Sequence, residues 1–161
     1  MKLALAFVIL FAASLWNSPF ALATAINPDK FVLQQWQIGK IHCPGCDKQV
    51  KSALQTTIGA KVKLGPTEFS GKLFDTCDGP TEVVLKKHSR QEKIDEIKDV
   101  LGAEVKFNPS TLQLPQEVVS AAVFCQGTNG VIGGSGARIL SIEDNRVLIL
   151  YGEQAILELR K

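Results

Sequence analysis

The residues with the clearest chemical potential are two cysteines in the stretch His42-Cys43-Pro44-Gly45-Cys46. Two thiols at this spacing can close a local disulfide, exchange disulfides with another protein, or bind a soft metal ion. A predicted helix begins at Asp47, and a helix N-terminus stabilises a nearby thiolate, which favours the second and third roles. If a metal binds, Cys43 and Cys46 are the soft ligands for Cu(I) or Zn(II), and His42 could assist them. Apart from such a metal, we expect no cofactor.

Two further cysteines, Cys77 and Cys125, bring the total to four, which allows three pairings. We favour Cys43–Cys46 together with Cys77–Cys125. The first pair is already held within bonding reach, and the second pair lies at the ends of predicted strands. A bridge that closes the loop between Cys77 and Cys125 would stabilise the fold by about 3–4 kcal/mol on the chain-entropy argument. All four cysteines therefore also have a purely structural interpretation.

The N-terminus predicts export. Lys2 is followed by an apolar run from Leu3 to Trp16, then by Pro19 and by small residues up to Ala25. This order is typical of a secretory signal peptide with its cleavage site, and the run is shorter than the roughly 20 apolar residues that span a bilayer. We expect residues 1–25 to be removed and residues 26–161 to form one periplasmic or secreted domain without a membrane span. An oxidising compartment then permits disulfides.

Charge and residue types exclude several function classes. The formal net charge is +2, and +1 without Lys2, so electrostatics recruit neither nucleic acid nor an anionic membrane. The chain has only two histidines, His42 and His88. His88 is expected to be solvated, and no convincing Ser-His-acid triad can be assembled. We therefore expect a non-enzymatic protein.

Hydrophobic periodicity predicts a mainly β domain. Two short helices are expected, one beginning at Asp47 and one beginning at Ser89, where Ser89 and Glu92 form a capping box and Gly102 ends the helix. Strands are predicted over residues 31–41, 60–64, 81–85, 104–107, 118–124, 137–142, 146–151 and 155–159. Short polar connections between the last three strands indicate an antiparallel meander. The expected fold is a small antiparallel β-barrel or curved sheet, with Trp36 in its core.

A local resemblance offers a different arrangement. From Gly39 to Leu64 the chain is similar to the heavy-metal-associated domain, because the CxxC pair is followed by apolar Val50, Ala53 and Leu54 and by Gly59. The resemblance implies a ferredoxin-like βαββαβ unit that carries copper, here followed by a C-terminal β-meander.

A longer resemblance covers most of the mature chain. The pattern resembles small exported bacterial lipocalin-like barrels, on the residues Trp36, 58–61, Phe69, Phe74, Cys77, Pro80, 123–125, 144–145, 147–152 and 157–160. It implies a Cys77–Cys125 bridge and a binding or inhibitory role, with a small ligand or an envelope or host protein as partner. The CxxC motif is an addition to this pattern, which leaves a redox or metal function open.

Overall fold

A computed structural model describes residues 34–65, 68–78, 81–102, 104–125, 136–152 and 154–161. The predicted signal peptide, residues 1–25, lies outside these ranges. The elements in chain order are β1 (Gln34–His42), α1 (Lys48–Gln55), β2 (Lys61–Leu64), β3 (Glu68–Gly71), β4 (Phe74–Asp78), β5 (Thr81–Ser89), α2 (Arg90–Leu101), the 3-10 helix η2 (Pro109–Leu112), β6 (Glu117–Cys125), β7 (Gly136–Ile142), β8 (Arg146–Tyr151) and β9 (Ala155–Arg160). No helix within the described ranges is long and apolar enough to cross a membrane.

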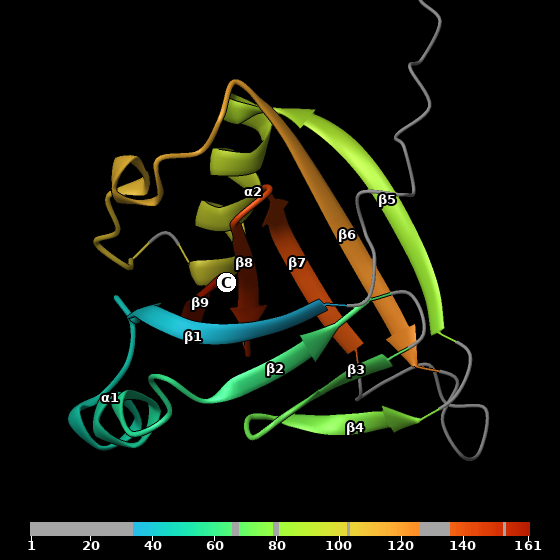
Figure 1. Ribbon diagram of the computed structural model, residues 1–161. Helices are drawn as coiled ribbons and strands as arrows, with labels where there is room; N and C mark the ends of the chain where they lie inside the picture. Colours follow the sequence, from blue (N-terminus) through green and yellow to red (C-terminus); the bar gives the residue numbers. More distant parts are fainter. Residues whose placement is uncertain (1–33, 66–67, 79–80, 103, 126–135, 153) are drawn as a thin grey trace, which may run out of the picture.

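The strands form one antiparallel sheet of nine strands in the order β4-β3-β2-β1-β9-β8-β7-β6-β5. The sheet curls strongly, so that β1 to β4 run in a different direction from β5 and β6 (Figure 1). In the described part of the chain β4 and β5 are the two edges, so the sheet is a half-barrel. The predicted fold class, a mainly β antiparallel curved sheet with two helices, is confirmed.

The alternative βαββαβ arrangement is wrong. In a βαβ unit the helix connects two parallel strands. Here the strands on either side of α1 are antiparallel neighbours, with Trp36 opposite Val62. The other neighbour of β1 is the last strand, β9, where Ile41 lies opposite Leu157.

The inner face of the curl holds the larger hydrophobic cluster. Residues from strands far apart in the sheet belong to it, including Trp36 of β1, Phe69 of β3 and Val123 of β6. Aromatic contacts link Phe69 to Phe74 of β4 at 4.5 Å, and Phe74 to Tyr151 of β8 at 5.8 Å between ring centroids. Because these side chains meet inside the curl, the concave side is a packed core. Trp36 is buried in it, as predicted.

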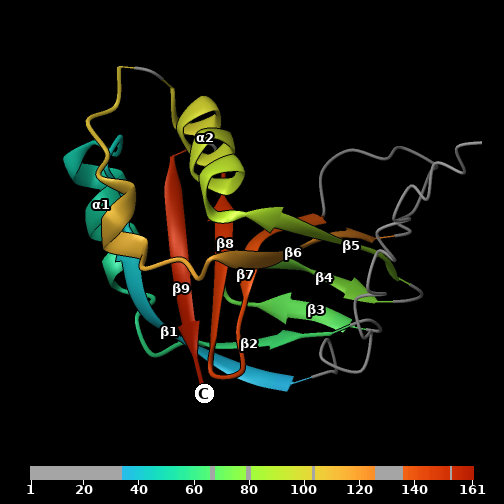
Figure 2. The same cartoon turned by 90° about the horizontal axis from the view of Figure 1, so that it is seen from above.

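The outer face of β6 to β9 carries a second cluster, which is covered by α2 and the segment that follows it. Figure 2 shows α2 on the outer side of the sheet. The buried members of this cluster are Ile97, Leu101, Leu112, Leu114, Val118, Leu140, Leu148 and Ile156. The sheet is therefore apolar on both faces in this region, which explains why β8 is a nearly continuous apolar run.

Local sequence signals place the helix ends. Ser89 and Glu92 form the predicted capping box of α2, and Gly102 ends the helix with φ 88°.

The last three strands form the predicted meander. The predicted strand over residues 104–107 is wrong, because these residues form a turn and an irregular segment that leads to η2, which Asn108 caps. Pairing β6 with β5 and β7 leaves this segment to cover the outer face instead.

Two strands, β3 and β4, lie where residue periodicity predicts none. They contain four and five residues, so neither is long enough to show alternation clearly. The two strands pair with each other, with Phe69 in β3 opposite Cys77 in β4.

Candidate functional site

The CxxC loop connects β1 to α1 at one end of the sheet. Cys43 and Cys46 lie at disulfide distance, with their Cα atoms 5.4 Å apart, in agreement with the predicted pair. Pro44 and Gly45 are exposed, whereas both cysteines are half-buried and pack against the inner cluster. The Sγ atom of Cys46 lies 3.9 Å from the carbonyl oxygen of Gln154. The disulfide therefore belongs both to the surface and to the edge of the core.

The other predicted bridge involves Cys77 of β4 and Cys125 of β6, whose side chains lie outside the described part of the structure. Cys125 pairs in register with Thr81. Thr81 follows Cys77 by four positions in the chain, so the two cysteine backbones belong to neighbouring regions of the fold. The Cys77–Cys125 bridge stays a prediction.

The start of α1 differs from the arrangement that would activate a thiol. The helix begins at Lys48, after both cysteines, and its N-cap is Asp47. The Asp47 carboxylate accepts a hydrogen bond from the Val50 backbone N–H at 2.8 Å. A negative charge thus already occupies the helix N-terminus beside Cys46, so the helix stabilises this carboxylate before it can stabilise a thiolate.

His42 faces away from the two cysteines. Ile41 packs into the inner cluster, and successive side chains of a strand alternate between faces, so His42 lies with Ile156 on the outer face. Its Nε2 atom lies 3.2 Å from Glu158 Oε2. Within the described residues, no group of three or more His, Cys, Asp or Glu side chains is placed to hold a metal ion. The structure does not bring His42 together with both sulfurs, and Cu(I) or Zn(II) binding at Cys43 and Cys46 stays a prediction.

Glu158 is the buried centre of a polar cluster on the outer face, formed with His42 and the exposed Arg160. Its side chain is 4% exposed. Arg160 donates to Glu158 Oε1 from Nε at 2.8 Å and from Nη2 at 2.6 Å. Burial opposes ionisation of Glu158, but the hydrogen bonds from Arg160 and His42 outweigh it and lower the pKa of this carboxyl. We call these three residues the Glu158 cluster.

A second polar cluster attaches α2 to the sheet. Lys93, 2% exposed, bonds through Nζ to Glu96 Oε2 at 2.6 Å, and Arg138 of β7 reaches Glu96 Oε1 at 3.0 Å. His88 is half-buried near them rather than solvated as expected. Burial, together with the positive charge of Lys93, lowers the pKa of its imidazole. The charges are paired between helix and strand, which is the arrangement of a structural anchor.

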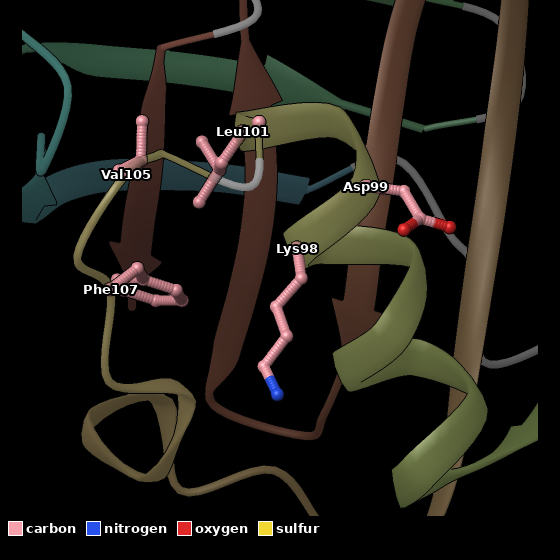
Figure 3. A pocket seen from close by; sticks show the side chains of 6 residues that line it. Lys98, Asp99, Leu101, Val105 and Phe107 are labelled. Carbon is pink, nitrogen blue, oxygen red and sulfur yellow. The ribbon is translucent and has the colours of Figure 1, made fainter.

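A hollow opens at the C-terminal end of α2, and we call it the α2 hollow. Its cavity volume is about 450 Å³, and it is lined by Lys98, Asp99, Leu101, Gly102, Val105 and Phe107. In Figure 3 Leu101, Val105 and Phe107 lie around the space, the Lys98 side chain runs along its edge with the ammonium group away from Leu101 and Val105, and Asp99 points away. Residue periodicity missed this feature because it predicts a strand over residues 104–107. Gly102 as a helix end was the only usable signal.

The CxxC loop packs directly on one wall of the α2 hollow. A Cβ atom placed on Gly45 would lie 3.3 Å from Val105 Cγ2 and 3.9 Å from Val105 Cγ1. Val105 therefore belongs to both features. The disulfide loop and the hollow form one composite site, built from the β1–α1 connection and the segment after α2.

No family model, curated protein or solved structure matches this chain. The fold class therefore rests on the antiparallel curled sheet itself, and function has to be argued from the composite site.

Proposed function

We propose that this protein is an exported, non-enzymatic binding protein and that the α2 hollow is its ligand site. The observation that carries the proposal is the contrast between the packed inner face and the hollow on the outer side. A volume of about 450 Å³ lies within the range of ligand sites, about 300–1,000 Å³. Apolar walls with a few polar groups at the rim are also typical of such sites.

The charges around the hollow favour one orientation of the ligand. The exposed Lys98 lines the hollow at its α2 edge (Figure 3), whereas the Glu104 carboxylate lies against Gly102. An apolar group would contact Leu101, Val105 and Phe107. A negative group on the same molecule would pair with Lys98. The ligand class is thus a small amphipathic anion, or an apolar side chain of a protein partner beside an acidic group.

The architecture supports an exported binding role. A curled antiparallel sheet of this kind agrees with the lipocalin-like resemblance, whose members carry ligands or inhibit host enzymes. The apolar N-terminal run supports a periplasmic or secreted location. Because the inner face is filled here, the ligand site of this protein would lie outside the curl, at the end of α2.

The test uses anilinonaphthalene sulfonate, a probe with apolar rings and one negative charge. We expect saturable fluorescence binding to the mature protein, lost in Val105→Asp, which places a negative charge in the apolar wall and repels the sulfonate. Lys98→Met should weaken binding about fivefold, the effect of one exposed charge pair of about 1 kcal/mol. Lys51→Met removes an exposed lysine of α1 and is the matched control. Probe binding that is unchanged in both Val105→Asp and Lys98→Met would overturn the proposal.

A second candidate function is thiol–disulfide exchange or metal handling at Cys43 and Cys46. The exposed Pro44-Gly45 tip, with two cysteines at disulfide distance, favours it. Native protein would be alkylated and weighed with and without reductant, and with Cu(I) or Zn(II) added. Two readily reducible cysteines mapped to Cys43 and Cys46, or a metal adduct lost in Cys43→Ser, support this candidate. Four unreactive cysteines under mild reductant eliminate it.

A further inference from the structure

We infer that the thiol state of Cys43 and Cys46 regulates the α2 hollow, because the CxxC loop contacts the hollow through Gly45 and Val105. The inference rests on the proposed ligand site and adds to it a redox input. The effector is a dithiol, either a small molecule or a protein.

The contact joins segments that are distant in the chain. A Cβ atom at Gly45 would lie only 3.3 Å from Val105 Cγ2, so there is no comfortable room for a larger side chain between the loop and the wall. Gly45 is not among the described glycines with positive φ, so its approach reflects packing rather than an unusual backbone conformation. A shift of the loop therefore reaches the Val105 side chain without an intermediary.

Val105 is in turn tied to the rest of the hollow. Its backbone N–H donates to the Gly102 carbonyl oxygen at 3.2 Å, and its own carbonyl oxygen accepts from the Phe107 N–H at 2.8 Å. Gly102 and Phe107 both line the hollow. A movement of Val105 would therefore move Gly102 and Phe107 with it and change the shape of the wall.

Both ends of the CxxC loop are held independently of the disulfide. At one end His42 is bonded to buried Glu158, and at the other end Asp47 caps α1. Opening the disulfide would consequently leave β1 and α1 in place and free mainly the residues between Cys43 and Cys46. Among the residues that line the hollow, Val105 is the one that lies against this loop.

The chemistry of this reduction is thiol–disulfide exchange. A thiolate of the dithiol attacks one sulfur of the pair, forming a mixed disulfide as the Cys43–Cys46 bond breaks and the other sulfur leaves as a thiolate. The second thiolate of the donor then displaces the bound sulfur. The donor departs as its own disulfide, and Cys43 and Cys46 gain two electrons and, on protonation, two protons. With the loop released, Val105 is less firmly positioned, and binding should weaken because preorganisation is lost.

The experiment measures anilinonaphthalene sulfonate affinity for the mature protein before and after dithiothreitol treatment. Alkylation and mass spectrometry confirm which cysteines opened. We expect affinity to fall about fivefold on reduction, at the lower end of coupling between two sites. The Cys43→Ala/Cys46→Ala variant should bind like the reduced protein, which separates this effect from reduction elsewhere in the chain.

A variant that keeps the disulfide is also measured, so that the test does not depend on correct folding of the double cysteine variant. Gly45→Ala adds a methyl group against Val105 and should change probe affinity in the oxidised protein, whereas Pro44→Ala on the same exposed tip should not. Unchanged affinity on reduction and in Gly45→Ala, while Val105→Asp still abolishes binding, overturns the redox inference and leaves the ligand site standing. Unchanged binding in Val105→Asp overturns the ligand site itself.

Discussion

The inner face of the curled sheet is covered by the sheet itself, whereas the outer face is covered by α2 and the irregular segment that follows it. On the inner face, Phe69 and Phe74 come from strands that the curl brings over β8, and their rings fill the centre. On the outer face, Leu101 and Leu112 cover the strands, but the segment between them leaves the α2 hollow. A sheet that packs on itself adjusts its curl to remove gaps, whereas a rigid helix laid on a twisted surface leaves space at its end.

The two faces also differ in whether they bury charged side chains. The inner cluster consists of hydrophobic side chains. The outer face buries Glu158 and Lys93, each with a charged partner. Among the described residues, the buried charged side chains therefore lie on the outer face, although both faces bury a hydrophobic cluster.

The largest expected effect tests the inner face. Phe69 is 2% exposed, and its ring packs against that of Phe74 in a tilted arrangement. Phe69→Ala should lower the free energy of unfolding by about 3–5 kcal/mol, since it removes a buried ring and leaves a cavity. Urea unfolding measures the change. Phe124→Ala, at an exposed phenylalanine of β6, is the control and should cost far less. Equal losses in the two variants would contradict the account of a single packed inner core.

The next effect concerns the buried charge of the outer face. Glu158→Gln keeps the shape of the side chain but removes the negative charge that Arg160 and His42 share. We expect a loss of about 1–3 kcal/mol in unfolding free energy, typical of hydrogen bonds to a charged group. Glu117→Gln, which affects an exposed pair with Lys87, is the matched control and should change stability by less than about 1 kcal/mol.

The same pair of variants predicts a pH dependence. Because the pKa of Glu158 is lowered in the folded state, its ionisation stabilises the fold above the ordinary carboxyl pKa of about 4.3. This contribution is lost as the pH falls through the folded-state pKa. The stability difference between the wild-type protein and Glu158→Gln should therefore be constant near neutral pH and shrink in acid. A difference that grows on acidification would show that Glu158 is not the stabilising anion.

The smallest effect tests the wall of the hollow. Phe107 is only half-buried beside the outer cluster. Phe107→Ala should cost about 1–2 kcal/mol in urea unfolding, less than Phe69→Ala because less apolar surface is removed from water. It should nevertheless weaken binding of anilinonaphthalene sulfonate. A stability loss as large as that of Phe69→Ala, with unchanged probe binding, would mean that Phe107 belongs to the core and not to a ligand site.

Features that depend on neighbouring residues were predictable from the sequence. The Ser89–Glu92 capping box, the helix end at Gly102 and the Cys43–Cys46 pair all follow from spacings of a few residues. The meander of β7 to β9 also follows from local pattern, because short polar turns can only join antiparallel neighbours.

Only the tertiary structure showed which segments that are far apart in the chain pair and pack against each other. The pairing of β1 with β9 buries Glu158, although alternation in Ala155 to Leu159 would place that residue on a solvated face. The same long-range packing makes residues 104–107 a wall instead of a strand and sets Val105 against Gly45. Periodicity reports only that a side chain faces one side of an element, and the partner that covers that side comes from elsewhere in the chain.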